Sequence, residues 1–305
     1  MSTPTSDGAV DTTYTRFAAD QAYVQANNAF VERLPLAGCT RILDLCCGTG
    51  AVGQIMMARA PQASYIGIDL DPVQIGLAEK NYAGLGYTVR RVADPASAVP
   101  FPKGRTVGLI VGSATDLGFP EATFDAVNIS NAIHLIADKE GLLASISRVL
   151  EPGGIYSFSS GFYAGCWPPV TQQVYYEWLK EATAWIARQS AERVARGEPP
   201  IKRQRGKSQL SPVAYGNRWL TPDEWRALLS DKGFEVRDLA ERPVTFDHDS
   251  LAKVGSYSGL AEAQLSGYPT EIAAKALEMT AGLALQSAGV EAVQHNWIEV
   301  VAVKR

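Results

Sequence analysis

The sequence has few of the residues, and none of the spacings, from which metal sites and disulfide frameworks are built. Its three histidines, His134, His248 and His295, are far apart, and two of its four cysteines are adjacent. No C-x-x-C spacing occurs, which argues against both a zinc site and a disulfide framework. Reduced thiols are typical of a cytoplasmic protein. We therefore expect a cytoplasmic protein without metal ligands.

Long apolar runs and an excess of positive charge are also lacking. No run approaches the roughly 18 apolar residues that span a bilayer. The first thirteen residues, MSTPTSDGAVDTT, are polar and do not resemble a signal peptide. The formal net charge of −4 argues against a protein whose main task is to hold nucleic acid. We expect neither a membrane nor a nucleic-acid partner.

Short apolar runs do occur, and in residues 41–160 they alternate with helical patterns, which predicts an α/β fold around a parallel sheet. Helix boundaries are expected where Asp71 precedes Pro72, at Asp138, and where Thr221 and Glu224 form a capping box. Including two later runs, seven strands are predicted, at 41–45, 64–70, 107–111, 124–130, 153–160, 234–239 and 296–305.

Segments outside this alternation are interpreted as helical covers over one edge of a single sheet. The predicted organisation is an N-terminal helical cover (1–35), a nucleotide-binding core (36–160), a lid (161–219), and a part that completes the sheet (220–305) and carries a helical pair at 248–292. That pair is apolar enough to cap a pocket or to form a contact in a homo-oligomer. Residues 90–106 contain three prolines and are expected to form a surface loop.

A G-x-G-x-x-G pattern links the first predicted strand to a helix. It consists of Gly48, Gly50 and Gly53, and Asp69 follows 19 residues after Gly50, at the end of the second strand. Such a loop holds a nucleotide, and the carboxylate accepts hydrogen bonds from the ribose hydroxyls. The lysine of a P-loop is missing. The pattern therefore fits both NAD and S-adenosylmethionine.

Four ordered motifs decide between these two cofactors: LDLCCGTG (43–50), IGIDLDP (66–72), GSATDLGFPEATFDAV (112–127) and LEPGG (150–154). Together they resemble class I S-adenosylmethionine-dependent methyltransferases of the small-molecule type. Asp44 supports the resemblance, since a carboxylate there would repel a pyrophosphate but attract the amino group of a methionine moiety. The resemblance implies a Rossmann-like, mostly parallel sheet whose last strand is antiparallel. It also implies S-adenosylmethionine as cofactor and S-adenosylhomocysteine as product.

The resemblance also implies cofactor contacts for residues at the strand ends. These residues are Asp44, Cys46, Gly48, Gly50, Asp69, Leu70, Ser113, Ala114, Ser130 and Asn131. Two of them depart from the family's pattern. Cys46 stands where glycine is usual, and Ser113 stands where an aspartate usually accepts from the adenine amino group. Asp116 could substitute for that aspartate.

Four aromatic side chains and one histidine are candidates for the reaction itself. His134 lies just beyond the fourth strand and suits a general base, or it shapes the loop by bonding Asp138 or a carbonyl group. Tyr14 is a candidate to close over the methionine end of the cofactor; the alternative is simple helix packing. An aromatic wall for the acceptor, or the packing of a lid, is predicted for three residues, Phe162, Tyr163 and Trp167.

The basic stretch 188–207 has a similar pair of readings, a solvated loop or a lid for an anionic substrate. The function predicted overall is methyl transfer to an O, N or C atom of a small-molecule acceptor. Three alternatives stay open: a fold that uses S-adenosylmethionine without methyl transfer, an NAD-dependent oxidoreductase, and a macromolecular methyltransferase.

Overall fold

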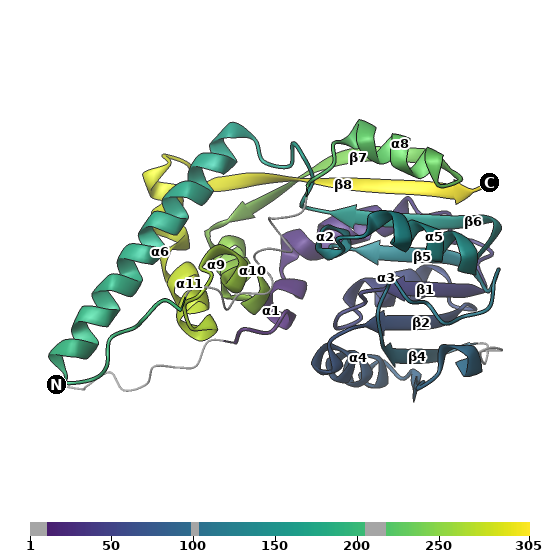
Figure 1. Ribbon diagram of the computed structural model, residues 1–305, viewed down its shortest axis with the longest axis horizontal. Helices are drawn as coiled ribbons and strands as arrows, with labels where there is room; N and C mark the ends of the chain where they lie inside the picture. The colour runs from purple at the N-terminus through teal and green to yellow at the C-terminus, as the bar shows by residue number, and fades with distance from the viewer. Residues whose placement is uncertain (1–10, 99–103, 205–217) are drawn as a thin grey trace. The chain divides into compact units, whose positions relative to one another are not determined.

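The computed structural model describes residues 11–98, 104–204 and 218–305. Within them it shows one sheet of eight strands in the order β3-β4-β2-β1-β5-β6-β8-β7 (Figure 1). The strands are β1 (Arg41–Leu45), β2 (Ser64–Asp69), β3 (Thr88–Arg91), β4 (Thr106–Val111), β5 (Phe124–Ser130), β6 (Leu150–Ser160), β7 (Phe234–Asp247) and β8 (Ala292–Lys304).

The sheet is parallel from β3 to β6, and β8 pairs antiparallel with β6. The predicted Rossmann-like fold is therefore confirmed. The chain order reverses at β1, which lies between β2 and β5. In open α/β sheets a ligand binds at the carboxyl ends of the strands where this reversal occurs.

The predicted count of seven strands was wrong, because β3 was not identified and its last two residues fall in the loop predicted at 90–106. Its sequence, TVRR, lacks apolar alternation, and its side chains are exposed or half-buried at the sheet edge. An edge strand of this kind carries little hydrophobic signal. β6, β7 and β8 also extend beyond the predicted ranges, whereas β1 and β5 match them.

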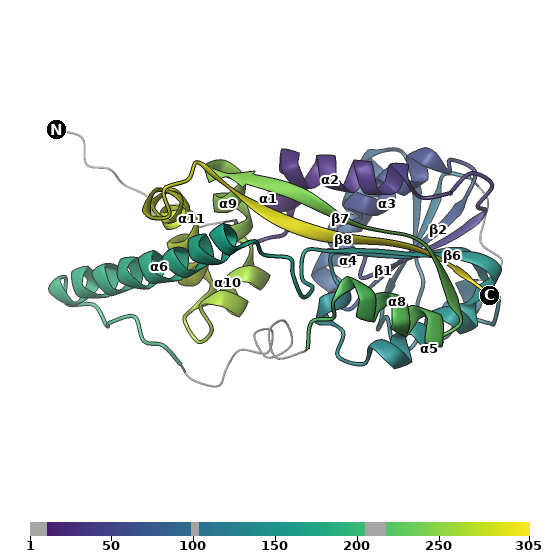
Figure 2. The same ribbon diagram turned by 90° about the horizontal axis from the view of Figure 1, so that it is seen from above.

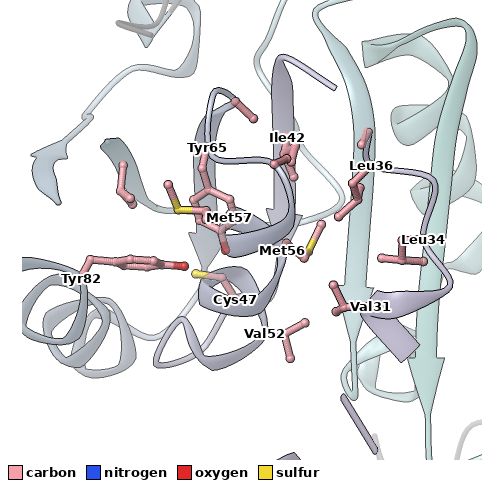
Figure 3. Close-up of a cluster of buried hydrophobic side chains, with 14 of the residues drawn as sticks. Val31, Leu34, Leu36, Ile42, Cys47, Val52, Met56, Met57, Tyr65 and Tyr82 are labelled. Atoms are coloured by element: carbon pink, nitrogen blue, oxygen red, sulfur yellow. The ribbon is translucent and has the colours of Figure 1, made fainter. Parts of the chain in front are cut away.

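Helices cover both faces of the sheet. One face packs against α2 (Gln21–Glu32), α3 (Ala51–Arg59) and α4 (Pro72–Gly84), with Val31, Met56 and Tyr82 in its core (Figure 3). The opposite face carries α5 (Lys139–Val149) and α8 (Pro222–Asp231) (Figure 2).

The predicted helix starts are confirmed. Asp71 accepts from the backbone N–H of Val73, and Asp138 accepts from that of Gly141. Thr221 and Glu224 form the capping box that opens α8. In each case a side-chain acceptor satisfies a backbone donor that the first helical turn leaves unpaired.

The chain divides into two compact units. The sheet unit comprises residues 24–166, 217–244 and 296–305, and the helical unit comprises 1–23, 167–216 and 245–295. Among the described residues, the helices of the second unit are α1 (Thr15–Ala18), α6 (Pro169–Ala195), α9 (His248–Ser256), α10 (Ser258–Gln264) and α11 (Thr270–Ser287). Its core includes Trp178, whose indole N–H donates to the carbonyl of Leu277 at 2.8 Å.

Residues 248–292 hold three helices instead of the predicted pair, because the extended backbone of Tyr257 separates α9 from α10. That these segments cover the sheet edge stays a prediction. No described helix is long and apolar enough to cross a membrane.

Candidate functional site

The loop after β1 is a tight turn in which several residues adopt left-handed backbone conformations. Cys46, Gly48 and Gly50 have φ values of 54°, 52° and 80°. A Cβ on Gly48 would meet no atom within 4 Å, so the backbone there borders open space. Gly53 differs, since its Cβ would lie 1.9 Å from the Tyr65 hydroxyl. The first glycine is therefore open to a ligand, whereas the third one packs against the core.

Asp69 lies at the end of β2 and is tied to this loop. Its Oδ2 accepts from the backbone N–H of Gly48 at 2.8 Å, and its Oδ1 accepts from that of Asp71 at 2.9 Å. Burial raises the pKa of the Asp69 carboxyl. A carboxylate oxygen accepts more than one hydrogen bond, so the group can still receive a hydroxyl of a ligand.

Two exposed apolar side chains flank Asp69. Leu70 is 74% exposed and Val111, at the end of the neighbouring strand β4, is 49% exposed. Side chains of this kind beside a hydroxyl acceptor suit an adenine ring attached to a ribose. The sequence reading missed Val111, although it directly precedes the motif that begins at Gly112.

The predicted adenine edge lies after Val111. Ser113 Oγ accepts from the backbone N–H of Thr115 at 3.2 Å and lies 2.9 Å from Thr115 Oγ1. Ala114 is buried, and Asp116 is exposed. Their contacts with a cofactor stay predictions.

Asp44 is buried in β1, with 2% of its surface exposed. Tyr65 Oη donates to its Oδ2 at 2.5 Å, and Asn128 Nδ2 donates to its Oδ1 at 2.8 Å. Burial raises its pKa to about 6, against the effect of these two hydrogen bonds. Asp44 would therefore act on a ligand through its charge. The sequence reading missed Tyr65 and Asn128, because each occupies an ordinary strand position.

Ser130 and Asn131 follow β5, as predicted. Ser130 Oγ accepts from Asn128 Nδ2 at 3.1 Å. Asn131 has a left-handed backbone (φ 55°), and its N–H donates to the Ser159 carbonyl at 2.8 Å. Both residues thus belong to the strand end that adjoins β1.

His134 lies in a short 3-10 helix, η2 (Ile133–Leu135), at the same strand end. Its Nδ1 is 3.2 Å from Ser160 Oγ, and its ring packs on Phe162 at 4.3 Å between centroids. Phe162 also contacts the Trp219 ring edge-on at 5.7 Å. The structure therefore brings together His134 and one predicted aromatic residue, and it adds Trp219.

The other predicted aromatic residues have different surroundings. Tyr163 is fully buried in the sheet unit. Trp167 belongs to the helical unit, where it stacks on Tyr175 at 4.8 Å and donates to His295 Nε2 at 2.9 Å. Tyr14 belongs to that unit as well, and its ring contacts the rings of Phe17, Tyr23 and Tyr257. Their contacts with cofactor or acceptor stay predictions.

Comparison with known proteins agrees with this geometry. Residues 43–158 match the family model described as a methyltransferase domain. Over this range, which is less than half of the 305 residues, the chain is similar to a methyltransferase domain. The matched range begins in β1 and ends in β6, so this domain contains the glycine loop, Asp69 and His134.

Two relatives differ in how much of the chain they match. A demethylmenaquinone methyltransferase of Thermus thermophilus is 35% identical over 114 residues, which are 37% of this chain and 44% of the relative. The chain thus spans less than half of that relative. A trans-aconitate 2-methyltransferase of Methylobacterium nodulans is 24% identical over 275 residues, covering 85% of this chain and 89% of the relative.

Solved structures show the same fold. A Bacillus halodurans protein, provisionally described as a methyltransferase, superimposes with a TM-score of 0.54 at 16% identity, covering 92% of this chain and 99% of the other. The [4+2]-cyclase SpnF has a TM-score of 0.51 at 17% identity, covering 98% of this chain and 84% of the other. At such identities the likeness concerns the fold alone.

Proposed function

We propose that this protein transfers a methyl group from S-adenosylmethionine to an O, N or C atom of a small-molecule acceptor and releases S-adenosylhomocysteine. One arrangement carries the proposal: the open glycine at Gly48, the Asp69 carboxylate beside it, and the exposed Leu70 and Val111. The negative charge of Asp44 beneath this loop opposes the alternative ligand NAD, whose pyrophosphate is anionic.

The residues present fit this cofactor part by part. Asp69 would hold the ribose hydroxyls, Leu70 and Val111 would enclose the adenine, and the backbone at Gly48 permits close approach. Ser130 and Asn131 would adjoin the methionine end. When bound, the cofactor supplies a methyl group on a positively charged sulfur. The protein has to align the acceptor and, where necessary, remove its proton.

His134 is the proposed base for that proton. Ser160 Oγ donates to the Phe162 carbonyl at 3.3 Å, so His134 Nδ1 is assigned as the donor in the contact with Ser160. Nε2 then carries the lone pair that accepts a proton. Phe162 holds the ring from one side.

The acceptor proposed is planar or partly apolar. Phe162 and Trp219 place aromatic surface next to His134, and such rings bind flat apolar groups. The relatives named above are methyltransferases of demethylmenaquinone and of trans-aconitate, which makes quinones and unsaturated acids the first compounds to test.

Calorimetric titration tests the cofactor. S-adenosylmethionine and S-adenosylhomocysteine are expected to bind at micromolar concentration and NAD not to bind; binding of NAD alone would refute the proposal. Release of S-adenosylhomocysteine is then assayed with quinones, unsaturated acids, cellular RNA and protein. Binding with no release from any acceptor would favour a fold that uses the cofactor without methyl transfer.

Substitution of His134 tests the base. His134→Gln is expected to lower kcat by about 10²–10⁴-fold, while the affinity for S-adenosylhomocysteine changes less than about threefold, because the ring contacts Ser160 and Phe162. The control is His248→Gln, at an exposed position in the helical unit, which is expected to keep wild-type kcat. An unchanged kcat in His134→Gln would leave His134 a structural role only.

A further inference from the structure

Asp44 lies in a file of buried polar side chains that crosses three neighbouring strands. Its register partner in β5 is Asn128, whose own partner in β6 is Ser157. Ser157 Oγ donates to Asn128 Oδ1 at 3.0 Å, and Asn128 Nδ2 donates to Asp44. Tyr65, in β2, donates to the other carboxylate oxygen. The pairing of the strands therefore fixes both donors to Asp44.

No cation compensates this buried carboxylate among the described ion pairs of the chain; the charged group that acts on Asp44 is Asp69, which is also negative. The other titratable groups around it are the thiols of Cys46 and Cys47 and the hydroxyls of Tyr65 and Tyr82. Burial raises the pKa of all four, so they are uncharged. A buried charge without a partner of opposite charge is unfavourable. The Asp44 carboxylate is such a charge, and it lies under the glycine loop.

The third glycine of the loop motif, Gly53, leaves room for the tyrosine that donates to Asp44. A Cβ on Gly53 would lie 1.9 Å from Tyr65 Oη and 2.3 Å from Tyr82 Oη. Tyr82 Oη donates to the carbonyl of Gly50 at 3.2 Å. Figure 3 shows both tyrosine rings beside Cys47 in the cluster beneath the loop. Gly53 thus provides the space in which Tyr65 reaches Asp44.

We propose that Tyr65 and Asn128 are positioning residues for the cofactor. Their two hydrogen bonds hold the Asp44 carboxylate ionised beneath the glycine loop, where its charge attracts the ammonium group of the methionine moiety. This inference rests on the proposed function, since it requires that the loop binds S-adenosylmethionine. Tyr65 and Asn128 would thus affect binding of the ammonium group through Asp44, without touching the ligand themselves.

The test measures binding of S-adenosylhomocysteine between pH 5 and pH 8.5 by calorimetry. Asp44 is charged above its pKa, so the affinity of the wild type is expected to fall as the pH drops through about 6. Tyr65→Phe removes one donor that favours the charged form. The midpoint of this fall is expected to move upward by about one pH unit. Asn128→Ala is expected to move it in the same direction.

Two controls separate positioning from simple loss of structure. Tyr156→Phe removes a hydroxyl that is equally buried but has no hydrogen-bond partner, and it is expected to keep the wild-type midpoint. The second ligand is 5′-methylthioadenosine, which lacks the ammonium group. Its affinity is expected to show no fall near pH 6 in any variant.

The outcomes distinguish the two proposals. If the wild type binds neither ligand, the proposed function fails. If it binds S-adenosylhomocysteine and Tyr65→Phe keeps the wild-type midpoint, the positioning role fails while the function stands. A loss of affinity for both ligands at every pH, with a lowered thermal midpoint, would show that Tyr65 serves the core alone.

Discussion

At the scale of single residues, the backbone of the glycine loop limits which side chains it accepts. Cys46 adopts φ 54°, a left-handed conformation that costs a residue with a Cβ about 1–2 kcal/mol. The sequence marked Cys46 as a departure from the usual glycine, and the φ angle supplies the physical reason why glycine suits the position. The buried Asp44 beside it is a second unfavourable feature of the same loop. Strain and buried charge of this kind concentrate at functional sites.

Relief of this strain is a testable prediction. Cys46→Gly is expected to raise the free energy of unfolding by about 1 kcal/mol and to tighten binding of S-adenosylhomocysteine, because the loop loses a Cβ. Urea denaturation and calorimetry measure the two effects. The matched control is Ala122→Gly, at an exposed position with φ 50°. It is expected to give the same gain in stability without any change in affinity; a loss of stability in both variants would refute the argument.

At the scale of secondary-structure elements, the strand–loop–helix unit assigns different tasks to glycines that look equivalent in the sequence. Gly48 borders open space in a left-handed conformation, whereas Gly53 lies in α3 against the hydroxyls of Tyr65 and Tyr82. We therefore expect Gly48 to affect ligand binding and Gly53 to affect packing. The difference arises because Gly48 faces open space and Gly53 faces the core.

Alanine substitution separates these tasks. Gly53→Ala forces Cβ into the tyrosine hydroxyls and is expected to cost about 1–3 kcal/mol of stability. Gly48→Ala is expected to cost about 1–2 kcal/mol through its backbone angle and to lower the affinity for S-adenosylhomocysteine at least tenfold. Gly84→Ala, in α4 with no atom within 4 Å, serves as control and is expected to be neutral or slightly stabilising. Equal affinities in Gly48→Ala and wild type would contradict the assignment.

At the scale of the whole molecule, the chain forms two units, each assembled from segments far apart in the sequence. The helical unit has its own core, in which Trp178 bonds the carbonyl of Leu277, and the buried Asp20 accepts from the Ser250 hydroxyl and the Lys253 ammonium group. Its basic stretch is partly engaged within the unit, since Arg193 and Arg196 pair with Glu198. Arg205 and Lys207 of that stretch lie outside the described residues.

Hydrogen exchange decides whether the helical unit takes part in cofactor binding. S-adenosylhomocysteine is expected to protect amides at 46–50, 112–114 and 130–131 in the sheet unit. If Tyr14 closes over the methionine end, as the sequence predicts, the amides of α1 (Thr15–Ala18) are protected as well. The control is Tyr14→Ala, which should remove protection in α1 and leave that at 46–50. Protection confined to the sheet unit in the wild type would contradict the prediction for Tyr14.

The sequence by itself determined the parallel sheet, the helix starts and the glycine-rich loop after the first strand. Each of these depends on local chemistry: apolar runs of strand length such as 41–45 and 124–130, side-chain caps such as Asp71, and glycines that allow left-handed angles. Local chemistry can be read from neighbouring residues, because the interacting groups are close in the chain.

The tertiary structure alone decided which distant side chains meet. Tyr65 and Asn128 reach Asp44 only because β2 and β5 pair on either side of β1. In the same way Phe162 and Trp219 join His134 only after β6 and the segment before α8 are in place. β3 is a strand because its backbone pairs with β4, although its polar sequence carries no hydrophobic pattern. Contacts of this kind depend on strand order and register, which no short stretch of sequence encodes.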